Sequence, residues 1–189
     1  MNTAEHIVNL FEKSIELKRK SIVLAPVIAE AAALLTARLV SGNKILICGN
    51  GGSAADAQHM AAELVNRFES ERPGLAAIAL TTDSSALTSI GNDSGFEQIF
   101  ARQVEAIGRT GDILVAITTS GESANLRAAV ATARDRGIAV VALTGRDGGA
   151  IGRLCGAEDC EIRVPGHNTA RIQEVQLVAC HRRLRQEEG

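Results

Sequence analysis

Hydrophobic and polar positions alternate with one regular spacing over the first 40 residues of the chain. Apolar side chains recur every three or four positions, first from Ile7 to Ile15 and again from Ile28 to Leu39. This spacing predicts two helices, because it gathers the apolar residues on one helical face. We expect Pro26 near the start of the second helix, where its missing N–H is harmless.

The pattern changes after Lys44, where short apolar runs alternate with small-residue loops and amphipathic stretches. The runs are "KILIC" at 44–48, "AAIAL" at 76–80, "DILVAI" at 112–117, "AVVAL" at 139–143 and "CEIRV" at 160–164. Runs this short, apolar on both faces and separated by helical segments, indicate a parallel sheet with helices on each side. We therefore predict one α/β domain over 1–189, in which a helical extension at 1–41 precedes a doubly wound core at 42–189.

The length and composition agree with one globular domain. A chain of 189 residues can bury a sizeable core, and 46% hydrophobic with 22% charged residues is typical of globular proteins. No apolar run approaches the ~18 residues that a membrane span requires, so we expect no membrane partner. The start of the chain, "MNTAEHIVNLFEKS", carries acidic residues early and lacks the features of a secretory signal, which favours the cytoplasm.

The charge and the aromatic content argue against nucleic acid as a ligand. The net charge is −2, and the sequence contains no Trp and no Tyr. It therefore lacks a broad basic face and the aromatic platforms on which single-stranded nucleic acids stack. Cys48, Cys155, Cys160 and Cys180 form no C-x-x-C pair, and we interpret them as reduced packing residues rather than metal ligands.

Three loops that follow predicted strands are rich in glycine and hydroxyl side chains. They are "GNGGS" at 49–53, "TTSGES" at 118–123 and "TGRDGG" at 144–149. Glycine lets the backbone approach a ligand, Ser and Thr add short donors, and a following helix supplies free N–H groups and a partial positive charge. Because ligands of such folds collect at the carboxyl ends of the strands, these loops predict an anion site, most simply a phosphate site.

A dinucleotide-binding loop is the rival interpretation, because Gly49, Gly51 and Ala54 satisfy G-x-G-x-x-G/A after a strand. That fold also needs an acidic residue about 20 positions further on to bind a ribose hydroxyl. Here Asp83 lies 34 positions past Gly49, and the hydroxyl-rich second loop has no role in dinucleotide binding. We therefore expect no nucleotide cofactor. Turns that merely need glycine are the weaker alternative.

A helix expected to follow the first loop, over residues 54–68, has two unlike faces. The apolar face holds Ala54, Ala57, Met60, Ala61, Leu64, Val65 and Phe68. The opposite face holds Asp56, His59, Glu63 and Arg67. His59 and Glu63 are neighbours at i and i+4, a spacing that suits a shared metal or an acid–base pair. The alternative is a solvated face with an ordinary ion pair.

The last helix, expected from about Thr169 to Arg185, is apolar on two sides and therefore buried between neighbours. One apolar stripe consists of Ile172, Val175, Val178 and Ala179, and the second side holds Leu177 and Leu184 beside Gln173 and His181. Glu174 also lies close to His181 on a helical wheel. The spacing alone therefore leaves open which neighbour of His181 is functional.

The sequence resembles a known family, the phosphoheptose isomerases of the sugar-isomerase (SIS) domain superfamily. The resemblance is carried by "CGNGGSAADAQHMAAEL", "GNDSGF", "TTSGESANL", "ALTGRDGG" and "EIRVP" followed by "ARIQEVQLVACH", and it covers nearly the whole chain. It implies a three-layer fold with a five-stranded parallel sheet, assembled as a homotetramer with active sites between subunits. It also implies conversion of D-sedoheptulose 7-phosphate to D-glycero-D-manno-heptose 7-phosphate, toward the heptose of lipopolysaccharide.

The resemblance implies roles for individual residues. Glu63 and His181 would be the acid–base pair, and zinc would be held through His59, Glu63, Gln173 and His181. The substrate would contact Asn50, Gly51, Gly52, Ser53, Arg67, Asn92, Asp93, Thr118, Thr119, Ser120, Ser123 and Gln173. Of these, the hydroxyls of Ser53, Thr118, Ser120 and Ser123 would line the phosphate site, and Asp93 and Gln173 would contact the sugar.

Two departures and one alternative accompany the resemblance. Ala170 stands where some relatives carry an acidic residue, and Thr118 replaces a Ser while keeping the hydroxyl. The alternative function is a non-catalytic SIS tetramer that binds the replication initiator DnaA and shares "NRFE" and "ARIQE". Proteins of that kind lack the acid and the histidine of the catalytic pair. Because Glu63 and His181 are both present, the sequence favours the isomerase.

Overall fold

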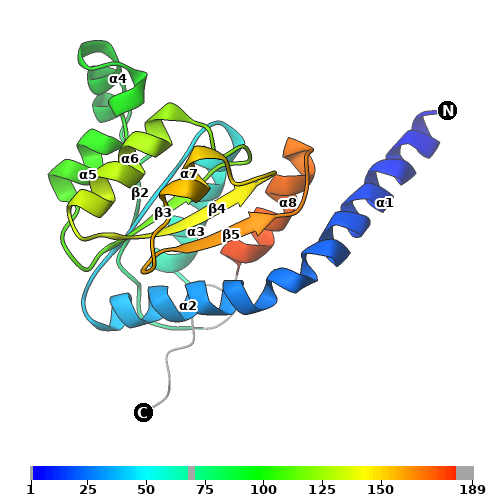
Figure 1. The fold of residues 1–189 in the computed structure, drawn as a ribbon, viewed down its shortest axis with the longest axis horizontal. Helices are drawn as coiled ribbons and strands as arrows, with labels where there is room; N and C mark the ends of the chain where they lie inside the picture. Colours follow the sequence, from blue (N-terminus) through cyan, green and yellow to red (C-terminus); the bar gives the residue numbers. More distant parts are fainter. Residues whose placement is uncertain (1, 68–70, 182–189) are drawn as a thin grey trace.

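Within residues 2–67 and 71–181, which this computed structural model describes, five strands form one parallel sheet in the order β2-β1-β3-β4-β5 (Figure 1). The strands are β1 (Ile45–Gly49), β2 (Ala77–Ala79), β3 (Ile113–Ile117), β4 (Ala139–Gly145) and β5 (Cys160–Val164). Each coincides with one of the predicted apolar runs, although β2 is shorter and β4 extends to Gly145. The doubly wound parallel sheet is thus confirmed.

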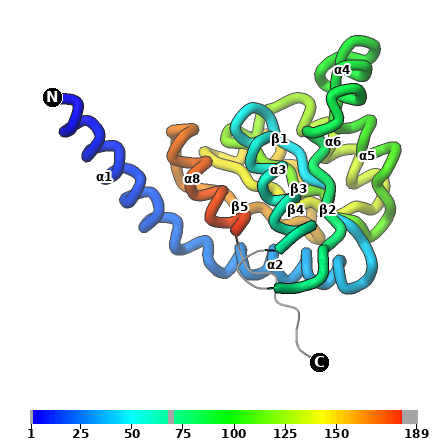
Figure 2. The backbone as a smooth tube through the Cα atoms, turned by 180° about the vertical axis from the view of Figure 1, so that it is seen from behind, coloured from blue at the N-terminus to red at the C-terminus, as the bar shows by residue number. Residues whose placement is uncertain are grey.

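Helices cover both faces of this sheet, as Figures 1 and 2 show from opposite sides. On one face lie α2 (Ala25–Val40), α3 (Gly52–Val65) and α8 (Thr169–Cys180). On the other lie η2 (Phe96–Gln98), α5 (Ala101–Ile107), α6 (Ala124–Asp135) and α7 (Gly149–Leu154). Alternate residues of a strand point to opposite faces, so the fully buried β3 supplies both cores. This explains why its sequence is continuously apolar.

The strand order places the switch point of the sheet between β1 and β3, which is where doubly wound folds form their ligand-binding crevice. These two strands are neighbours, yet β1 leads into α3 on one face of the sheet and β3 leads into α6 on the other. Loops that diverge in this way leave an opening beyond the carboxyl ends of the strands, where doubly wound proteins bind their ligands. The first and second glycine-rich loops border this opening.

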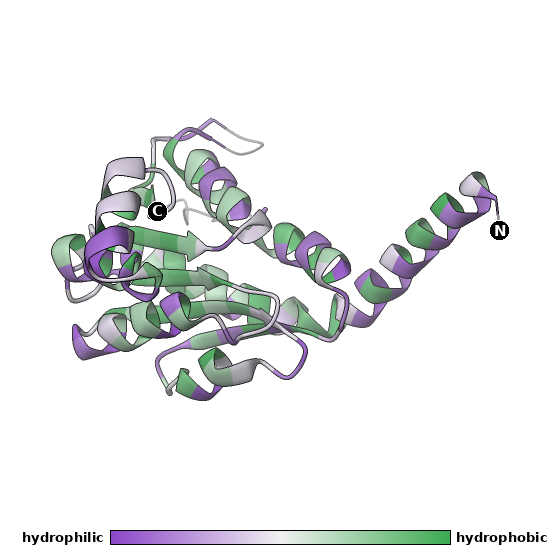
Figure 3. Cartoon of the chain, turned by 90° about the horizontal axis from the view of Figure 1, so that it is seen from above, coloured by the Kyte–Doolittle hydropathy of each residue, from purple (hydrophilic) through white to green (hydrophobic). Residues whose placement is uncertain are grey.

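The first helix, α1 (Thr3–Ser21), extends away from the sheet, and η1 (Ile22–Leu24) joins it to α2. Asn2 and Glu5 form a capping box that fixes its start, and Ser14, Leu17 and Ser21 are buried on one side. Another side is apolar and exposed, as Figure 3 shows where α1 stands clear of the body. The exposed apolar residues of this stripe are Ile7, Phe11, Ile15 and Ile22.

The helical run Thr3–Val40 is long and apolar enough in composition to cross a membrane, so the expectation that no stretch would reach this composition was wrong. Helices that pack inside proteins meet the same criterion. Here η1 interrupts the run, and α2 buries Ala31 and Leu35 completely against the sheet. The second predicted helix is therefore part of the core, with Pro26 in its first turn as expected.

Asp112 ties the amino-terminal ends of β1 and β3 together. Its carboxylate is buried and accepts hydrogen bonds from the backbone N–H of Lys44 (3.0 Å), from the ammonium of Lys44 (2.6 Å) and from the N–H of Arg109 (2.8 Å). Burial by itself would raise the pKa of this carboxyl. The hydrogen bonds from Lys44 and Arg109 and the charge of Lys44 outweigh burial, so the pKa is lowered.

We expect Asp112→Asn to reduce the free energy of unfolding by about 1–3 kcal/mol at pH 7, because it weakens charge-assisted hydrogen bonds in a buried site. A carboxyl whose pKa is lowered by folding stabilises above the unfolded-state value of about 3.9, and this contribution disappears as the pH falls through the folded-state value. Urea unfolding at a series of pH values should therefore show wild type and variant converging below about pH 4. A constant difference down to pH 3 would contradict this account.

Burial also explains the chemistry of two cysteines. Cys48 lies within β1, and burial raises the pKa of its thiol. At Cys155 burial is again the main cause, reinforced by the nearby carboxylates of Asp159 and Glu161, and the pKa rises to about 12. Both side chains are therefore protonated thiols at neutral pH, which agrees with their interpretation as packing residues.

Candidate active site

The loop after β1 makes a tight turn into α3. Gly51 precedes the helix with a φ of 56°, a conformation that favours glycine. A Cβ on Gly49 would lie 2.5 Å from the carbonyl oxygen of Ser53, so the turn has no room for a side chain there. Ser53 is buried in this turn. The positive end of the α3 dipole thus lies at the edge of the crevice, as an anion site requires.

The loop after β3 holds its hydroxyl groups in defined positions. The Thr118 hydroxyl oxygen accepts a hydrogen bond from the N–H of Gly121 at 3.1 Å, and the Ser120 oxygen accepts one from the N–H of Glu122 at 3.2 Å. Each hydroxyl keeps its own hydrogen for donation to a ligand. Ser123 stands at the N-cap of α6, where the helix dipole also favours an anion.

Asn50 and Asn125 join the two loops. Each side-chain amide donates to the other's oxygen at 2.9 Å, so Asn50 of the first loop is fixed to the first turn of α6, just after the second loop. Asn125 is 2% exposed. Asn125 was not predicted as a site residue, because its partner is a side-chain amide in a loop and no pattern in the sequence marks that contact.

The third glycine-rich loop supports the second. A Cβ on Gly121 would collide with the carbonyl oxygen of Gly148, and the N–H of Ile151 donates to the Gly121 carbonyl at 3.0 Å. Similarly, a Cβ on Gly145 would lie 2.7 Å from the carbonyl oxygen of Thr119. The glycines of the third loop therefore allow close contact with the second loop, which accounts for them without a further anion site.

Helix α3 begins and ends slightly earlier than predicted, spanning Gly52–Val65 instead of 54–68. Its buried face holds Ala57, Met60, Ala61 and Leu64, as expected. Val65, assigned to the apolar face, is exposed because the helix ends there, and Phe68 lies outside the described residues. Arg67 lies beyond the helix, where its side chain pairs with Glu71 at 2.9 Å. Its expected contact with the substrate stays a prediction.

The structure brings His59 of α3 and His181 at the end of α8 into direct contact. Their Nε2 atoms are 2.7 Å apart, and the Nε2 of His59 is 3.9 Å from the carboxylate of Glu63. A hydrogen bond between two imidazoles needs one ring to present a lone pair and the other an N–H. Two residues more than a hundred positions apart thus form a hydrogen-bonded pair beside a carboxylate.

Asp56 lies one turn before His59 and belongs to the same polar cluster. Burial raises the pKa of its carboxyl, and the nearby His59 and His181 partly oppose this effect. The predicted polar face of α3 remains partly exposed, with the His59 and Glu63 side chains 43% and 27% exposed, and its function stays a prediction.

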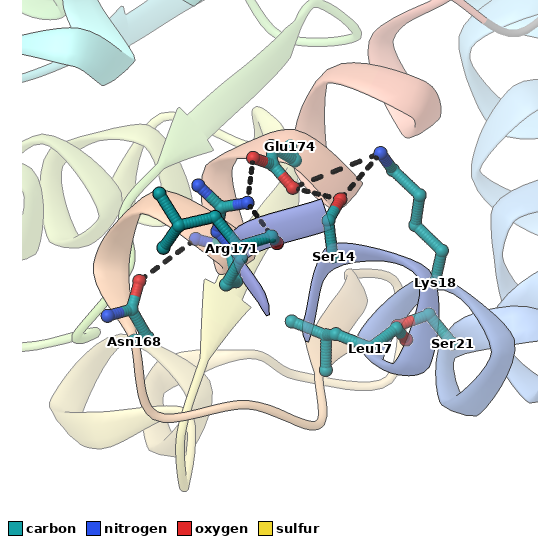
Figure 4. Close-up of polar contacts among 8 residues, drawn as sticks. Ser14, Leu17, Lys18, Ser21, Asn168, Arg171 and Glu174 are labelled. Atoms are coloured by element: carbon teal, nitrogen blue, oxygen red, sulfur yellow. Dashed lines mark hydrogen bonds and ion pairs between the residues drawn. The ribbon is translucent and has the colours of Figure 1, made fainter. Parts of the chain in front are cut away.

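The structure separates the roles of Gln173 and Glu174, which the helical wheel could not. Glu174 faces α1, where its carboxylate accepts a hydrogen bond from Ser14 at 2.5 Å and pairs with Arg171 at 2.8 Å and Lys18 at 3.9 Å (Figure 4). Gln173 faces the first loop, and its side-chain Nε2 would lie 2.5 Å from a Cβ on Gly52. Gln173 is therefore the neighbour of His181 that borders the crevice.

We expect Gly52→Ala to lower kcat/KM by about tenfold, because the new methyl group displaces the Gln173 amide. Thermal stability should be unchanged or slightly higher, since alanine is favoured over glycine in a helix. Kinetic assays with the sugar phosphate that the resemblance implies as substrate, together with a melting curve, measure both effects. In a Gln173→Ala background the same change should have little further effect on kcat/KM, and a full additional tenfold loss would contradict the contact.

Helix α8 spans Thr169–Cys180, and His181 is its C-cap, so the prediction of a helix to Arg185 is tested only up to His181. Ile172, Val175 and Ala179 are buried as predicted. Val178, assigned to the same stripe, is 57% exposed, and that assignment was wrong. Leu184 lies outside the described residues. Ala170 is exposed in the first turn, and its effect on the substrate stays a prediction.

Asn92 and Asp93 lie away from this cluster. Both are on α4 (Ser84–Asp93), which follows the edge strand β2 and projects from the body at the end remote from α8 (Figures 1 and 2). Asn92 donates to the Asp93 carboxylate at 2.8 Å, and both residues are exposed. The fold of one chain thus does not bring these two predicted substrate contacts to His59 and His181.

The donor set of the cluster is chemically suited to zinc, which accepts imidazole nitrogens and carboxylate oxygens. In the described part of the chain, no group of three or more His, Cys, Asp or Glu side chains is already arranged to hold a metal. The Nε2 atoms of His59 and His181 are in contact and could both ligate a metal, and the Glu63 carboxylate nearby offers a third ligand.

Comparisons with known proteins identify the family of the chain. The SIS-domain family model matches residues 11–145. Phosphoheptose isomerase of Alkalilimnicola ehrlichii is 56% identical over 182 residues, which cover 96% of this chain and 93% of that protein. The structures of phosphoheptose isomerases from Neisseria gonorrhoeae and Francisella tularensis have TM-scores of 0.91 and 0.93 at 48% and 47% identity, covering 95% and 96% of this chain and 95% of each of theirs. The chain belongs to the phosphoheptose isomerase family of SIS-domain enzymes.

Proposed function

We propose that this chain interconverts D-sedoheptulose 7-phosphate and D-glycero-D-manno-heptose 7-phosphate, toward the heptose of lipopolysaccharide. The observation that carries the proposal is the contact between His59 and His181, with Glu63 beside them. His59 and Glu63 belong to α3, the helix that follows the first loop. An isomerase of a sugar phosphate needs an anion site that fixes the sugar and, some distance away, groups that move a proton between adjacent carbons. The relatives' names and the site geometry support the same reaction.

The phosphate would bind between the two loops at the β1–β3 crevice. The hydroxyls of Ser53, Thr118, Ser120 and Ser123 are short donors, and the amino-terminal ends of α3 and α6 add the favourable ends of their dipoles. Gly51 and Gly52, with the backbone of Asn50 and Thr119, allow close approach. This arrangement binds a dianion through hydrogen bonds and helix dipoles without a lysine or arginine in the loops.

The chemistry proceeds through an enediol. Glu63 would remove the proton from the carbon next to the carbonyl, and His181 would protonate the carbonyl oxygen. In the second half of the reaction each group reverses its role, so the proton returns to the neighbouring carbon and the carbonyl forms on the other side. His59, in contact with His181, would fix the tautomer of that ring, and Gln173 would orient the sugar hydroxyls.

Zinc is the proposed cofactor, and His59, Glu63, Gln173 and His181 would hold it. Glu63 and His181 cannot hold the metal and act as free base and free acid at the same moment, so zinc bound there would polarise the substrate carbonyl or hold the site closed. Its binding has a direct readout, because zinc that binds the folded chain raises the melting temperature.

We further propose a homotetramer with active sites shared between subunits. The exposed apolar stripe of α1 suits a second copy of the chain, since exposed apolar patches of this kind mark interaction surfaces. Asn92 and Asp93 would serve a neighbouring subunit's site, which explains why they lie remote from His181 in their own chain. A cytoplasmic location agrees with a small phosphorylated substrate.

Incubation with sedoheptulose 7-phosphate should yield the aldose 7-phosphate, detected by NMR of the sugar carbons. A chelator should slow the reaction by about 10–100-fold, and added zinc should restore it. A rate unchanged by the chelator would contradict the role of zinc. Absence of product with and without zinc would contradict the isomerase and favour the alternative of a DnaA-binding protein, which a binding measurement with purified DnaA would test.

A further inference from the structure

Gln176 is a buried polar residue of α8 that has no direct part in the proposed chemistry. Its side chain is fully buried, and it lies between Gln173 and His181 on the same helix. The two hydrogens of its side-chain Nε2 are shared among three backbone carbonyls, those of Thr118 at 2.8 Å, Leu143 at 3.1 Å and Thr144 at 3.2 Å. One amide thus contacts two adjacent strand ends.

These carbonyls lie where the second loop leaves the sheet. Thr118 is the first residue after β3, and its N–H donates to the Leu143 carbonyl of β4 at 2.9 Å. From there the loop runs free of the β-ladder to the N-cap of α6 at Ser123. The amide of Gln176 therefore holds the loop at the point from which its hydroxyl groups are positioned.

The two halves of the Gln176 amide have different surroundings. Its Oε1 is buried and has no hydrogen-bond partner among the described residues. A buried acceptor without a donor destabilises the folded state. A methionine of similar length would avoid that penalty but would lose the N–H donors. The benefit of glutamine at this position must therefore come from the contacts of Nε2.

We propose that Gln176 is a positioning residue that fixes the second loop to α8, so that the phosphate-binding hydroxyls and His181 share one rigid frame. Gln173 makes the corresponding contact with the first loop at Gly52. Helix α8, which ends at His181, would then hold both loops in position. The catalytic consequence rests on the proposed isomerase function, whereas the loop contact can be measured without it.

The test is Gln176→Met, which keeps the length of the side chain and removes its donors. We expect KM for sedoheptulose 7-phosphate to rise about tenfold, while kcat changes less than about threefold, because the lost contact positions the phosphate-binding loop rather than the reacting groups. Amide hydrogen exchange of residues 118–123 should accelerate at the same time. The exchange measurement needs no substrate, so it distinguishes failure of this proposal from failure of the isomerase function.

The matched control is Val175→Ala. Val175 is the buried neighbour of Gln176 and packs with Leu17, Val164 and Ile172, away from the second loop. Val175→Ala should lower the melting temperature, yet leave KM and the amide hydrogen exchange of residues 118–123 at wild-type values. A KM rise of equal size in this control, or wild-type KM and exchange in Gln176→Met, would overturn the proposal. If Gln176→Met fails to fold, Gln176→His replaces it as the test variant, because its side chain has one N–H for the three carbonyls. KM and the amide exchange of residues 118–123 are then measured in the same way.

Discussion

Replacing Glu63 with glutamine should reduce kcat by about 10³-fold, because the amide cannot accept the proton that leaves the substrate carbon. Glutamine keeps the size of the side chain and most of its hydrogen bonding, so the fold and the phosphate site should persist. Steady-state kinetics with sedoheptulose 7-phosphate measure the loss. Binding of inorganic phosphate, followed by calorimetry, should change little, since the loops at Ser53 and Ser120 are untouched.

Glu174→Gln is the matched control for this variant. It makes the same chemical change on a carboxylate that faces α1 and contacts Ser14, Lys18 and Arg171. It should lower the melting temperature, as expected when a partly buried ionic contact is weakened, and leave kcat within about threefold of wild type. Comparable activity in the Glu63 and Glu174 variants would remove Glu63 from the mechanism.

The sequence determines much of the fold because both faces of the sheet are buried. A parallel strand covered by helices must be apolar at every position, so runs such as "DILVAI" are visible without any alignment. The edge strand β2 is short and half exposed, and there the run predicts a longer strand than the one that forms. In the centre of the sheet the apolar run and the buried strand coincide. At the edge strand β2 the apolar run is longer than the strand.

The site was harder to predict, because a helical wheel gives the direction of a side chain and not the identity of its neighbour. The helical wheel left Gln173 and Glu174 as alternative partners of His181, and only the family resemblance favoured Gln173. The position of α1 separates the two residues, since Ser14 and Arg171 bind the carboxylate of Glu174. Gln176 and Asn125 were missed for a related reason. Their partners are backbone carbonyls and a loop amide, which leave no pattern in the sequence.

The second large effect is expected from a change in the exposed apolar stripe of α1. Phe11 is 67% exposed in the middle of the α1 stripe, between Ile7 and Ile15. A large aromatic side chain in that position is stabilised by burial against another chain, in the manner of an interface anchor. We therefore expect Phe11→Glu to convert the proposed homotetramer to smaller species, as measured by light scattering during gel filtration.

Activity should fall with assembly, by about a hundredfold for Phe11→Glu, if a neighbouring subunit completes each site. Lys13→Glu is the control, because Lys13 is exposed on the same helix outside the apolar stripe and its replacement also introduces a negative charge. That variant should remain tetrameric and active. A Phe11→Glu protein that dissociates yet keeps full activity would show that the His59–His181 site works within one chain, and Asn92 and Asp93 would then have no catalytic role. Loss of both properties would instead support an active site that an adjoining subunit completes.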